Sequence, residues 1–275
     1  MIDTPLVATI GAAFALAGVR HGRRLLELRW EPNRHTAAAI AAGLLPALLS
    51  TFCLLLSQDS QAYQLVLFVG IFGFCGFFVP WAYVLFVEGQ SPAALGIRCE
   101  AWIPSLIISG VFALGPIYGI VEAKDLETYP LSHLLGAALQ LNVGGLFETF
   151  LYCGFLHLRL RDAFGPIPAI IGSAGIYSLW HIGTELPMHA DPTSALIMLF
   201  VIGLLCHTLF ATTYNVLAVW PLFFSAGVMN DFLVNLDLPE AIGASIIWTA
   251  VGWALAGFIP AGLWWVSRRR FARAS

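Results

Sequence analysis

Long apolar stretches alternate with short polar stretches along the whole chain. An α-helix that crosses the hydrocarbon core of a bilayer needs about 20 mostly apolar residues. Stretches of roughly this length recur from one end of the chain to the other. The pattern predicts about nine transmembrane helices, at residues 4–19, 36–56, 65–87, 102–121, 134–158, 167–183, 195–213, 216–235 and 241–266.

The composition narrows the class of protein. Of the 275 residues, 59% are apolar and 11% are charged, and the mean hydropathy is +0.83. A soluble domain has about 25% charged residues and a disordered chain is poor in apolar ones, so both classes are excluded. A net charge of −3 with only 13 Lys and Arg residues argues against nucleic-acid binding. We therefore expect an all-α, polytopic membrane helix bundle that forms a single membrane domain over residues 1–275.

The basic residues distinguish the two sides of this bundle. If nine helices alternate in direction, only Lys124 lies on one side and every other basic residue lies on the opposite side. Cytoplasmic loops are enriched in Lys and Arg, which predicts an outside N-terminus and a cytoplasmic C-terminus. Trp264 and Trp265 precede Arg268, as aromatic anchors at the inner interface do. The loops on the outer side are acidic, with Glu122, Asp125, Glu127, Glu185, Asp191, Asp237 and Glu240.

Three polar side chains interrupt the apolar stretches at similar depth. An ionisable group inside a bilayer costs on the order of 3 kcal/mol, so each is a candidate functional residue. Counting about 1.5 Å per residue from the cytoplasmic ends places Glu148 at about 15 Å and both His181 and Asn230 at about 21 Å. Asp231 follows Asn230 directly. A carboxylate that activates water, an imidazole that shares its proton and an amide that stabilises an oxyanion together predict a hydrolytic centre.

Structural interpretations of these polar groups stay open beside the catalytic one. Glu148 and His181 could form a buried hydrogen-bonded contact between helices. Gln140 and Asn142 are better explained as interhelical hydrogen-bonding residues. His207 fits either polar packing or a supporting place beside the site. The remaining histidines of the second half of the chain lie at predicted helix ends or in loops and are interpreted as interfacial: His133, His157 and His189.

Four segments carry recognisable motifs. Residues 148–154 read ETFLYCG, residues 177–181 read YSLWH, residues 203–230 form an apolar segment that ends in Asn, and residues 91–102 read SPAALGIRCEAW. The first three resemble the EExxxRG, [F/Y]xxxH and HxxxN motifs of the CPBP family of intramembrane proteases, which includes the CAAX prenyl endoprotease. The fourth resembles the LGLR-type segment that precedes the core helices of that family. The resemblance covers about residues 90–235.

This resemblance implies a function and the roles of individual residues. It implies an intramembrane endopeptidase that cleaves a membrane-associated peptide, with Glu148 as the base that activates water and His181 as its partner. Asn230 would supply the surviving half of the oxyanion site. It also implies that the chain is a multi-pass integral protein of a bacterial inner (plasma) membrane. Such a protein contacts the lipid bilayer, and we expect no nucleic-acid partner.

The chain departs from the family motifs at three positions. Thr149 replaces the second Glu of the first motif, Cys153 replaces its Arg, and Ala226 replaces the His of the third motif. Loss of one oxyanion donor typically lowers the rate by about 10²–10³-fold. The alternative function is therefore a catalytically impaired family member that acts as a non-catalytic membrane subunit or partner-binding scaffold. His207, at about 9 Å from the inner face, is poorly placed to compensate. A transporter is a third, less favoured reading, because no inverted halves are visible.

A zinc centre is the remaining enzymatic variant. Catalytic zinc needs three protein ligands, which on paper could be Glu148, His181 and Cys153. Cys153 follows Glu148 by five residues, about 140° around an α-helix, so the two side chains would face different directions. The five cysteines are scattered and form no metal-binding spacing, which is typical of small buried apolar residues. We therefore expect no metal and no other cofactor.

Overall fold

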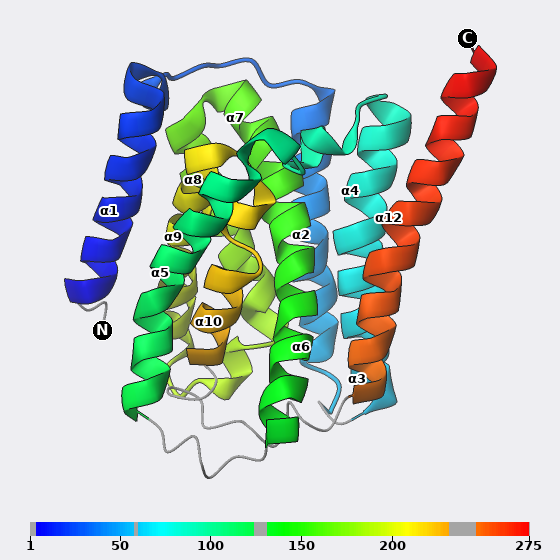
Figure 1. Cartoon of the computed structure of the whole chain (residues 1–275). Coiled ribbons are helices and arrows are strands. Elements are labelled where there is room, and N and C mark those ends of the chain that lie inside the picture. The colour runs from blue at the N-terminus through cyan, green and yellow to red at the C-terminus, as the bar shows by residue number, and fades with distance from the viewer. Residues whose placement is uncertain (1–3, 58–59, 124–130, 231–245, 275) are drawn as a thin grey trace.

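The computed structural model describes residues 4–57, 60–123, 131–230 and 246–274. This part of the chain is helical and contains no β-strand, which confirms the all-α fold class. The long helices run up and down along roughly one direction, with α1 (Thr4–His21) at one edge and α12 (Ile246–Ala274) at the other (Figure 1). Lys124, Asp231, Asp237 and the predicted helix limits at 235 and 241 lie outside the described residues.

The remaining elements follow in chain order. The first half contains η1 (Gly22–Leu26), α2 (Arg34–Cys53), α3 (Gln61–Gln64), η2 (Leu65–Phe78), α4 (Val79–Ala82), η3 (Tyr83–Val87), η4 (Pro92–Leu95), η5 (Cys99–Ala101) and α5 (Trp102–Ala123). The second half contains α6 (Leu131–Glu148), η7 (Thr149–His157), α7 (Leu158–Phe164), α8 (Pro166–Trp180), η8 (His181–Gly183), η9 (Leu186–Met188), α9 (Pro192–Thr213), η10 (Val216–Ala218) and α10 (Leu222–Asn230). α3 to η3 form one continuous helical run, as do α6, η7 and α7.

Five helical runs are long and apolar enough to cross a membrane. They are Arg34–Cys53, Gln61–Val87, Cys99–Glu122, Pro192–Thr213 and Ile246–Arg269. Each of them overlaps a segment that the sequence pattern predicts as transmembrane. The protein is therefore an integral, multi-pass membrane protein.

Local sequence signals explain where several helices begin. Asn33 caps α2, accepting from the backbone N–H groups of His35 and Thr36. Asp191 caps α9 in the same way, directly before Pro192. These side chains satisfy N–H groups that would otherwise lack a partner at the start of a helix.

The outer surface of α5 shows how the bundle suits a lipid environment. Its inward face carries Ser105 and Ser109, both fully buried. The Ser105 hydroxyl donates to Thr213 Oγ1 at 2.9 Å, and Ser109 Oγ accepts from the backbone N–H of Phe223 at 2.9 Å. The outward face is apolar, with Ile103, Ile107, Val111, Leu114, Tyr118 and Val121 exposed. Polar groups that pair inside and apolar groups outside are the arrangement expected in a bilayer.

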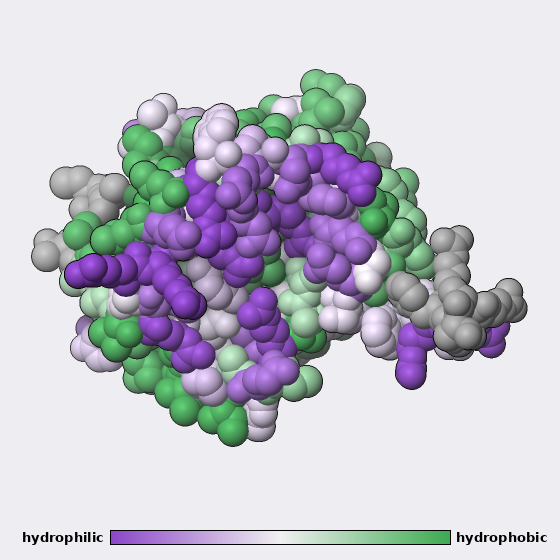
Figure 2. All heavy atoms as spheres, turned by 90° about the horizontal axis from the view of Figure 1, so that it is seen from above, coloured by the Kyte–Doolittle hydropathy of each residue, from purple (hydrophilic) through white to green (hydrophobic). Residues whose placement is uncertain are grey.

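One end of the bundle is polar. Figure 2 views the end at which α7 lies and shows polar residues gathered across it, with apolar residues around much of the rim. At the C-terminal end of α12, the Arg268 and Arg269 guanidinium carbons lie 6.0 and 3.4 Å from the ring centroids of Trp264 and Trp265. Such stacked Trp–Arg pairs are typical of a membrane–water interface.

The run from α6 to α7 is the centre of the core. Phe147, Leu151, Tyr152 and Phe155 are fully buried, and η7 packs against α2, α8, α9 and η2. η7 is a π-helical stretch that begins directly after Glu148. π-Helical turns are rare and occur frequently at functional sites, because the wider i→i+5 turn changes which side chains share a face.

Candidate active site

Glu148 and His181 come together from two different helices. Glu148 ends α6, and His181 begins the short turn η8 at the end of α8. Glu148 Oε1 lies 3.4 Å from His181 Nε2, and the two side chains are only 6% and 1% exposed. The two residues that the sequence analysis places at similar depth thus form a direct contact in the core.

The neighbours of the pair fix its orientation. Trp180 Nε1–H donates to Glu148 Oε1 at 2.9 Å. His181 Nδ1 lies 3.1 Å from the backbone carbonyl oxygen of Tyr177. A carbonyl oxygen can only accept a hydrogen bond, so Nδ1 carries the proton of neutral His181 and Nε2 faces Glu148 with its lone pair. A proton held between Nε2 and the carboxylate then makes their contact attractive.

A second carboxylate reaches the same imidazole. Glu185 Oε1 lies 3.5 Å from His181 Nε2, so this nitrogen lies within reach of two carboxylate groups. From the sequence, Glu185 is expected only in an acidic outer loop, and its contact with His181 is not predicted. The available signal was its spacing of four residues from His181, which brings two side chains onto one face of a helical turn.

Two glycines allow the backbone to approach closely beside the site. A Cβ atom at Gly183, which ends η8, would overlap the carbonyl oxygen of Ser50 in α2. A Cβ atom at Gly154 in η7 would overlap the carbonyl oxygen of Leu95 in η4. Neither backbone can move aside for a side chain without shifting the element it belongs to. Gly183 therefore holds the His181 turn against α2, and Gly154 holds the Glu148 helix against η4.

Asn230 lies beside α5. It is the last described residue of α10, half-buried, and a Cβ atom at Gly119 of α5 would lie 2.7 Å from its Oδ1. The contacts that join Glu148 to His181 and Trp180 do not involve Asn230. Ala226, one turn earlier, is buried.

The interhelical role expected of Asn142 is confirmed. Its Oδ1 accepts from the Ser225 hydroxyl at 2.5 Å, which joins α6 to α10. Its Nδ2 donates to the Ala138 carbonyl at 2.9 Å within α6. α10 is thereby positioned beside the helix that ends in Glu148.

Part of the chain is similar to a known protein family. A family model described as type II CAAX prenyl endopeptidase Rce1-like matches residues 130–230. This range contains Glu148, His181 and Asn230. The match covers less than half of the chain, and residues 130–230 are thus similar to this family of proteases. No curated protein and no solved structure matches the chain.

The position of the family's motif Arg is occupied by a buried Cys–His contact. Cys153 Sγ lies 3.6 Å from His207 Nδ1 in α9. The His207 ring stacks on that of His157, with centroids 5.4 Å apart and an interplanar angle of 13°. Tyr177 packs edge-on against both His181 and His207 and separates this cluster from the Glu148–His181 pair.

The expectation that His157 is interfacial is wrong. His157 is 0% exposed, and neither ring nitrogen has a hydrogen-bond partner in the described part of the chain. It lies in the π-helical stretch η7, in the middle of the run from α6 to α7, rather than at a helix end. Among the described residues, no group of three His, Cys, Asp or Glu side chains is arranged to hold a metal ion.

Proposed function

We propose that this protein is a CAAX-protease-type intramembrane endopeptidase in which Glu148 and His181 activate a water molecule. The contact of 3.4 Å between their side chains, made by two separate helices in a buried setting, is the observation that carries the proposal. An unpaired carboxylate at this depth is costly, so a partnered Glu–His contact fits a maintained chemical role. The family assignment of residues 130–230 supports the same reaction class.

The reaction follows from the chemistry of the pair. Glu148 Oε2, which has no hydrogen-bond partner among the described residues, accepts a proton from the attacking water. The hydroxide oxygen bonds to the carbonyl carbon of the scissile peptide and gives a tetrahedral oxyanion. Collapse of this intermediate breaks the C–N bond, and the proton taken by Glu148 passes to the leaving nitrogen. His181 holds the carboxylate in place and shares its proton during the transfer.

Two further residues complete the proposed machinery. Asn230 acts as an oxyanion donor through its amide N–H groups, in line with the third motif of the family. Glu185 positions His181 through the same ring nitrogen that Glu148 contacts, and supplies the second carboxylate that Thr149 no longer provides.

We further propose a membrane topology, which the distribution of basic residues favours. The chain crosses the membrane nine times, with its N-terminus outside and its C-terminus in the cytoplasm, in a bacterial inner membrane. Its substrate is a membrane-associated peptide. No metal or other cofactor takes part in the proposed reaction.

A non-catalytic role is the second candidate, and one observation favours it. The Thr149 hydroxyl donates to the Gly145 carbonyl within its own helix at 2.6 Å, so this motif position serves local packing. Cys153 likewise faces His207 rather than Glu148. A family member that had lost catalysis would keep such contacts and act as a subunit or scaffold.

A cleavage assay separates the two candidates. The full-length protein in liposomes is offered internally quenched CAAX peptides with and without a farnesyl group. Glu148→Gln and His181→Ala are each expected to lower cleavage by about 10²-fold or more. Glu122→Gln is the matched control, because this exposed carboxylate lies outside the site. Cleavage that survives Glu148→Gln would refute the dyad. The non-catalytic role would be favoured if the parent protein cleaves no peptide and if both the parent and the Glu148→Gln variant co-purify with a stoichiometric membrane partner.

A further inference from the structure

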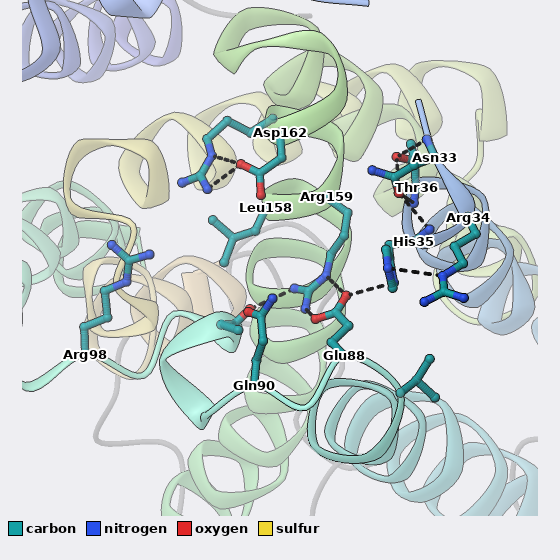
Figure 3. Close-up of a pocket in the computed structure, with 13 residues that line it drawn as sticks. Asn33, Arg34, His35, Thr36, Glu88, Gln90, Arg98, Leu158, Arg159 and Asp162 are labelled. Carbon is teal, nitrogen blue, oxygen red and sulfur yellow. Dashed lines mark hydrogen bonds and ion pairs between the residues drawn. The ribbon is translucent and has the colours of Figure 1, made fainter. Parts of the chain in front are cut away.

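A cavity opens at the polar end of the bundle, apart from the proposed catalytic pair. Its volume is about 380 Å³. Small-molecule sites commonly measure about 300–1,000 Å³. The start of α2, the loop after η3, η4 and α7 line it (Figure 3). Arg159 on its wall and Glu148 lie on one helical run, about 16 Å apart at about 1.5 Å per residue.

Two of the four guanidinium groups in this cavity are already neutralised. Arg159 forms a two-pronged ion pair with Glu88, at 3.1 Å from Nε and 2.5 Å from Nη2, and the two side chains are only 8% and 6% exposed. Its Nη1 donates to the Ala94 carbonyl at 2.8 Å. Arg161 pairs with its neighbour Asp162 at 2.6 Å.

The other two guanidinium groups keep an uncompensated charge. Neither Arg34 nor Arg98 forms an ion pair with an acidic residue in the described part of the chain. Figure 3 shows Arg98 on one side of the cavity and Arg34 on the other, with the Arg159–Glu88 pair between them. The cavity therefore carries a net positive charge that no ion pair among the described residues balances.

The segment beside the cavity indicates the level at which it lies. Leu26, Leu28 and Trp30 are 68%, 73% and 82% exposed, although they alternate with charged residues, namely Glu27, Arg29 and Glu31. The backbone N–H of Arg29 donates to the Phe164 carbonyl at 3.1 Å, which ties this segment to the end of α7. Exposed Leu and Trp side chains next to charged residues are typical of the headgroup region of a membrane.

We propose that this cavity binds the phosphate group of an anionic phospholipid headgroup, with Arg34 and Arg98 supplying the positive charge that attracts it. Guanidinium groups bind phosphate through paired, charge-assisted hydrogen bonds. Basic pockets at helix ends are known to hold anionic lipid headgroups. A free phosphate group offers the same chemistry, but the adjoining exposed apolar segment favours the lipid as its source. This inference does not depend on the proposed proteolysis.

Lipid binding to the full chain tests the proposal. The delipidated protein in a maltoside detergent is titrated with palmitoyl-oleoyl phosphatidylglycerol, with the matching phosphatidylcholine or with inorganic phosphate, and bound lipid is counted by native mass spectrometry. We expect phosphatidylglycerol to bind in preference to phosphatidylcholine. The double change Arg34→Gln and Arg98→Gln should weaken that binding about tenfold or more. Arg23→Gln with Arg24→Gln removes the same charge from exposed residues outside the cavity and should change it less than about twofold.

Each outcome decides the question. Equal weakening in both double variants, or no preference for phosphatidylglycerol, overturns the site. Inorganic phosphate that competes fully with the lipid overturns the lipid as the source but supports a phosphate site. If the double variant does not elute as a single species in gel filtration, Arg34→Lys and Arg98→Lys carry the test. Each keeps the charge but loses the two-pronged geometry, and each should weaken binding several-fold.

Discussion

At the residue scale, the central feature is one imidazole nitrogen shared by two carboxylates. His181 Nε2 lies 3.4 Å from Glu148 and 3.5 Å from Glu185, while Nδ1 is held by the Tyr177 carbonyl. A single nitrogen can donate only one proton, so it can pair fully with only one carboxylate at a time. Any proton that leaves Glu148 therefore changes how Glu185 interacts with the ring.

Glu185→Gln tests this coupling. The amide keeps the size of the side chain but loses its charge. We therefore expect kcat to fall about tenfold with little change in KM. This loss is smaller than the contribution of a general base, which is about 10²–10⁴-fold. The measurement is steady-state cleavage of a quenched peptide in liposomes. Glu185→Asp, which retains the charge, should recover part of the rate. A KM effect with unchanged kcat would instead assign Glu185 to substrate binding.

Gly183→Ala tests the close contact that holds the His181 turn. A methyl group would overlap the Ser50 carbonyl oxygen, and backbone on both sides resists the shift. We expect destabilisation of about 1–3 kcal/mol or more, measured by thermal unfolding in detergent. Gly115→Ala in α5 is the matched control, because no atom lies within 4 Å of its added Cβ. Equal unfolding temperatures for the two variants would show that the turn can relax.

At the element scale, a buried ion pair joins α7 to the end of η3. Arg159 and Glu88 are both almost fully buried, and Arg159 also donates to the Ala94 and Gly154 carbonyls. The continuous run from α6 to α7 carries Glu148, so this pair fixes one end of the helix on which the site is built. The other end of that run is joined to α10 through Asn142 and Ser225.

Removing one partner of this pair should cost more than removing both. Arg159→Met leaves the buried Glu88 carboxylate with only the His35 imidazole, at 3.6 Å, as a partner in the described residues, and breaking such a buried pair typically costs about 3–5 kcal/mol. Arg159→Met with Glu88→Gln should recover a large part of that loss, since no unpaired charge remains. Thermal unfolding of both single variants and the double variant measures the coupling. Additive losses would show that the two side chains contribute independently.

At the scale of the whole molecule, the unequal distribution of basic residues predicts which end faces the cytoplasm. Cys99 is the one exposed cysteine, and the other four are buried. It follows Arg98 at the end of the bundle that carries Arg159 and Arg161. Cys99 can therefore be labelled chemically to test on which side of the membrane this end of the bundle lies.

A membrane-impermeant maleimide should label Cys99 in inside-out vesicles but not in intact cells. Cys99→Ser is the control for labelling at other positions. Glu122→Cys in the Cys99→Ser background should show the reverse pattern, because Glu122 lies at the far end of α5. Labelling of Cys99 from outside intact cells would contradict the proposed orientation.

The sequence by itself determined the class of the protein, the approximate limits of its helices and two members of the candidate site. These follow from local properties. Apolar length defines a membrane helix, and a carboxylate or imidazole inside one is costly enough to stand out. Depth along two helices was sufficient to pair Glu148 with His181, because residues at one level of a bundle of parallel helices can meet.

Only the tertiary structure decided which side chains share a face and which loop residues fold back onto the core. Glu185 reaches His181 because the η8 turn, which packs against α2, brings residues four apart together, and the hydropathy pattern alone does not show that turn. His157 is buried because η7 continues α6 without a break, although its position near a predicted limit suggested an interface. Cys153 meets His207 across two helices. Such contacts depend on helix rotation and packing, which change with a few residues of π-helix and leave the hydropathy of the chain unaltered.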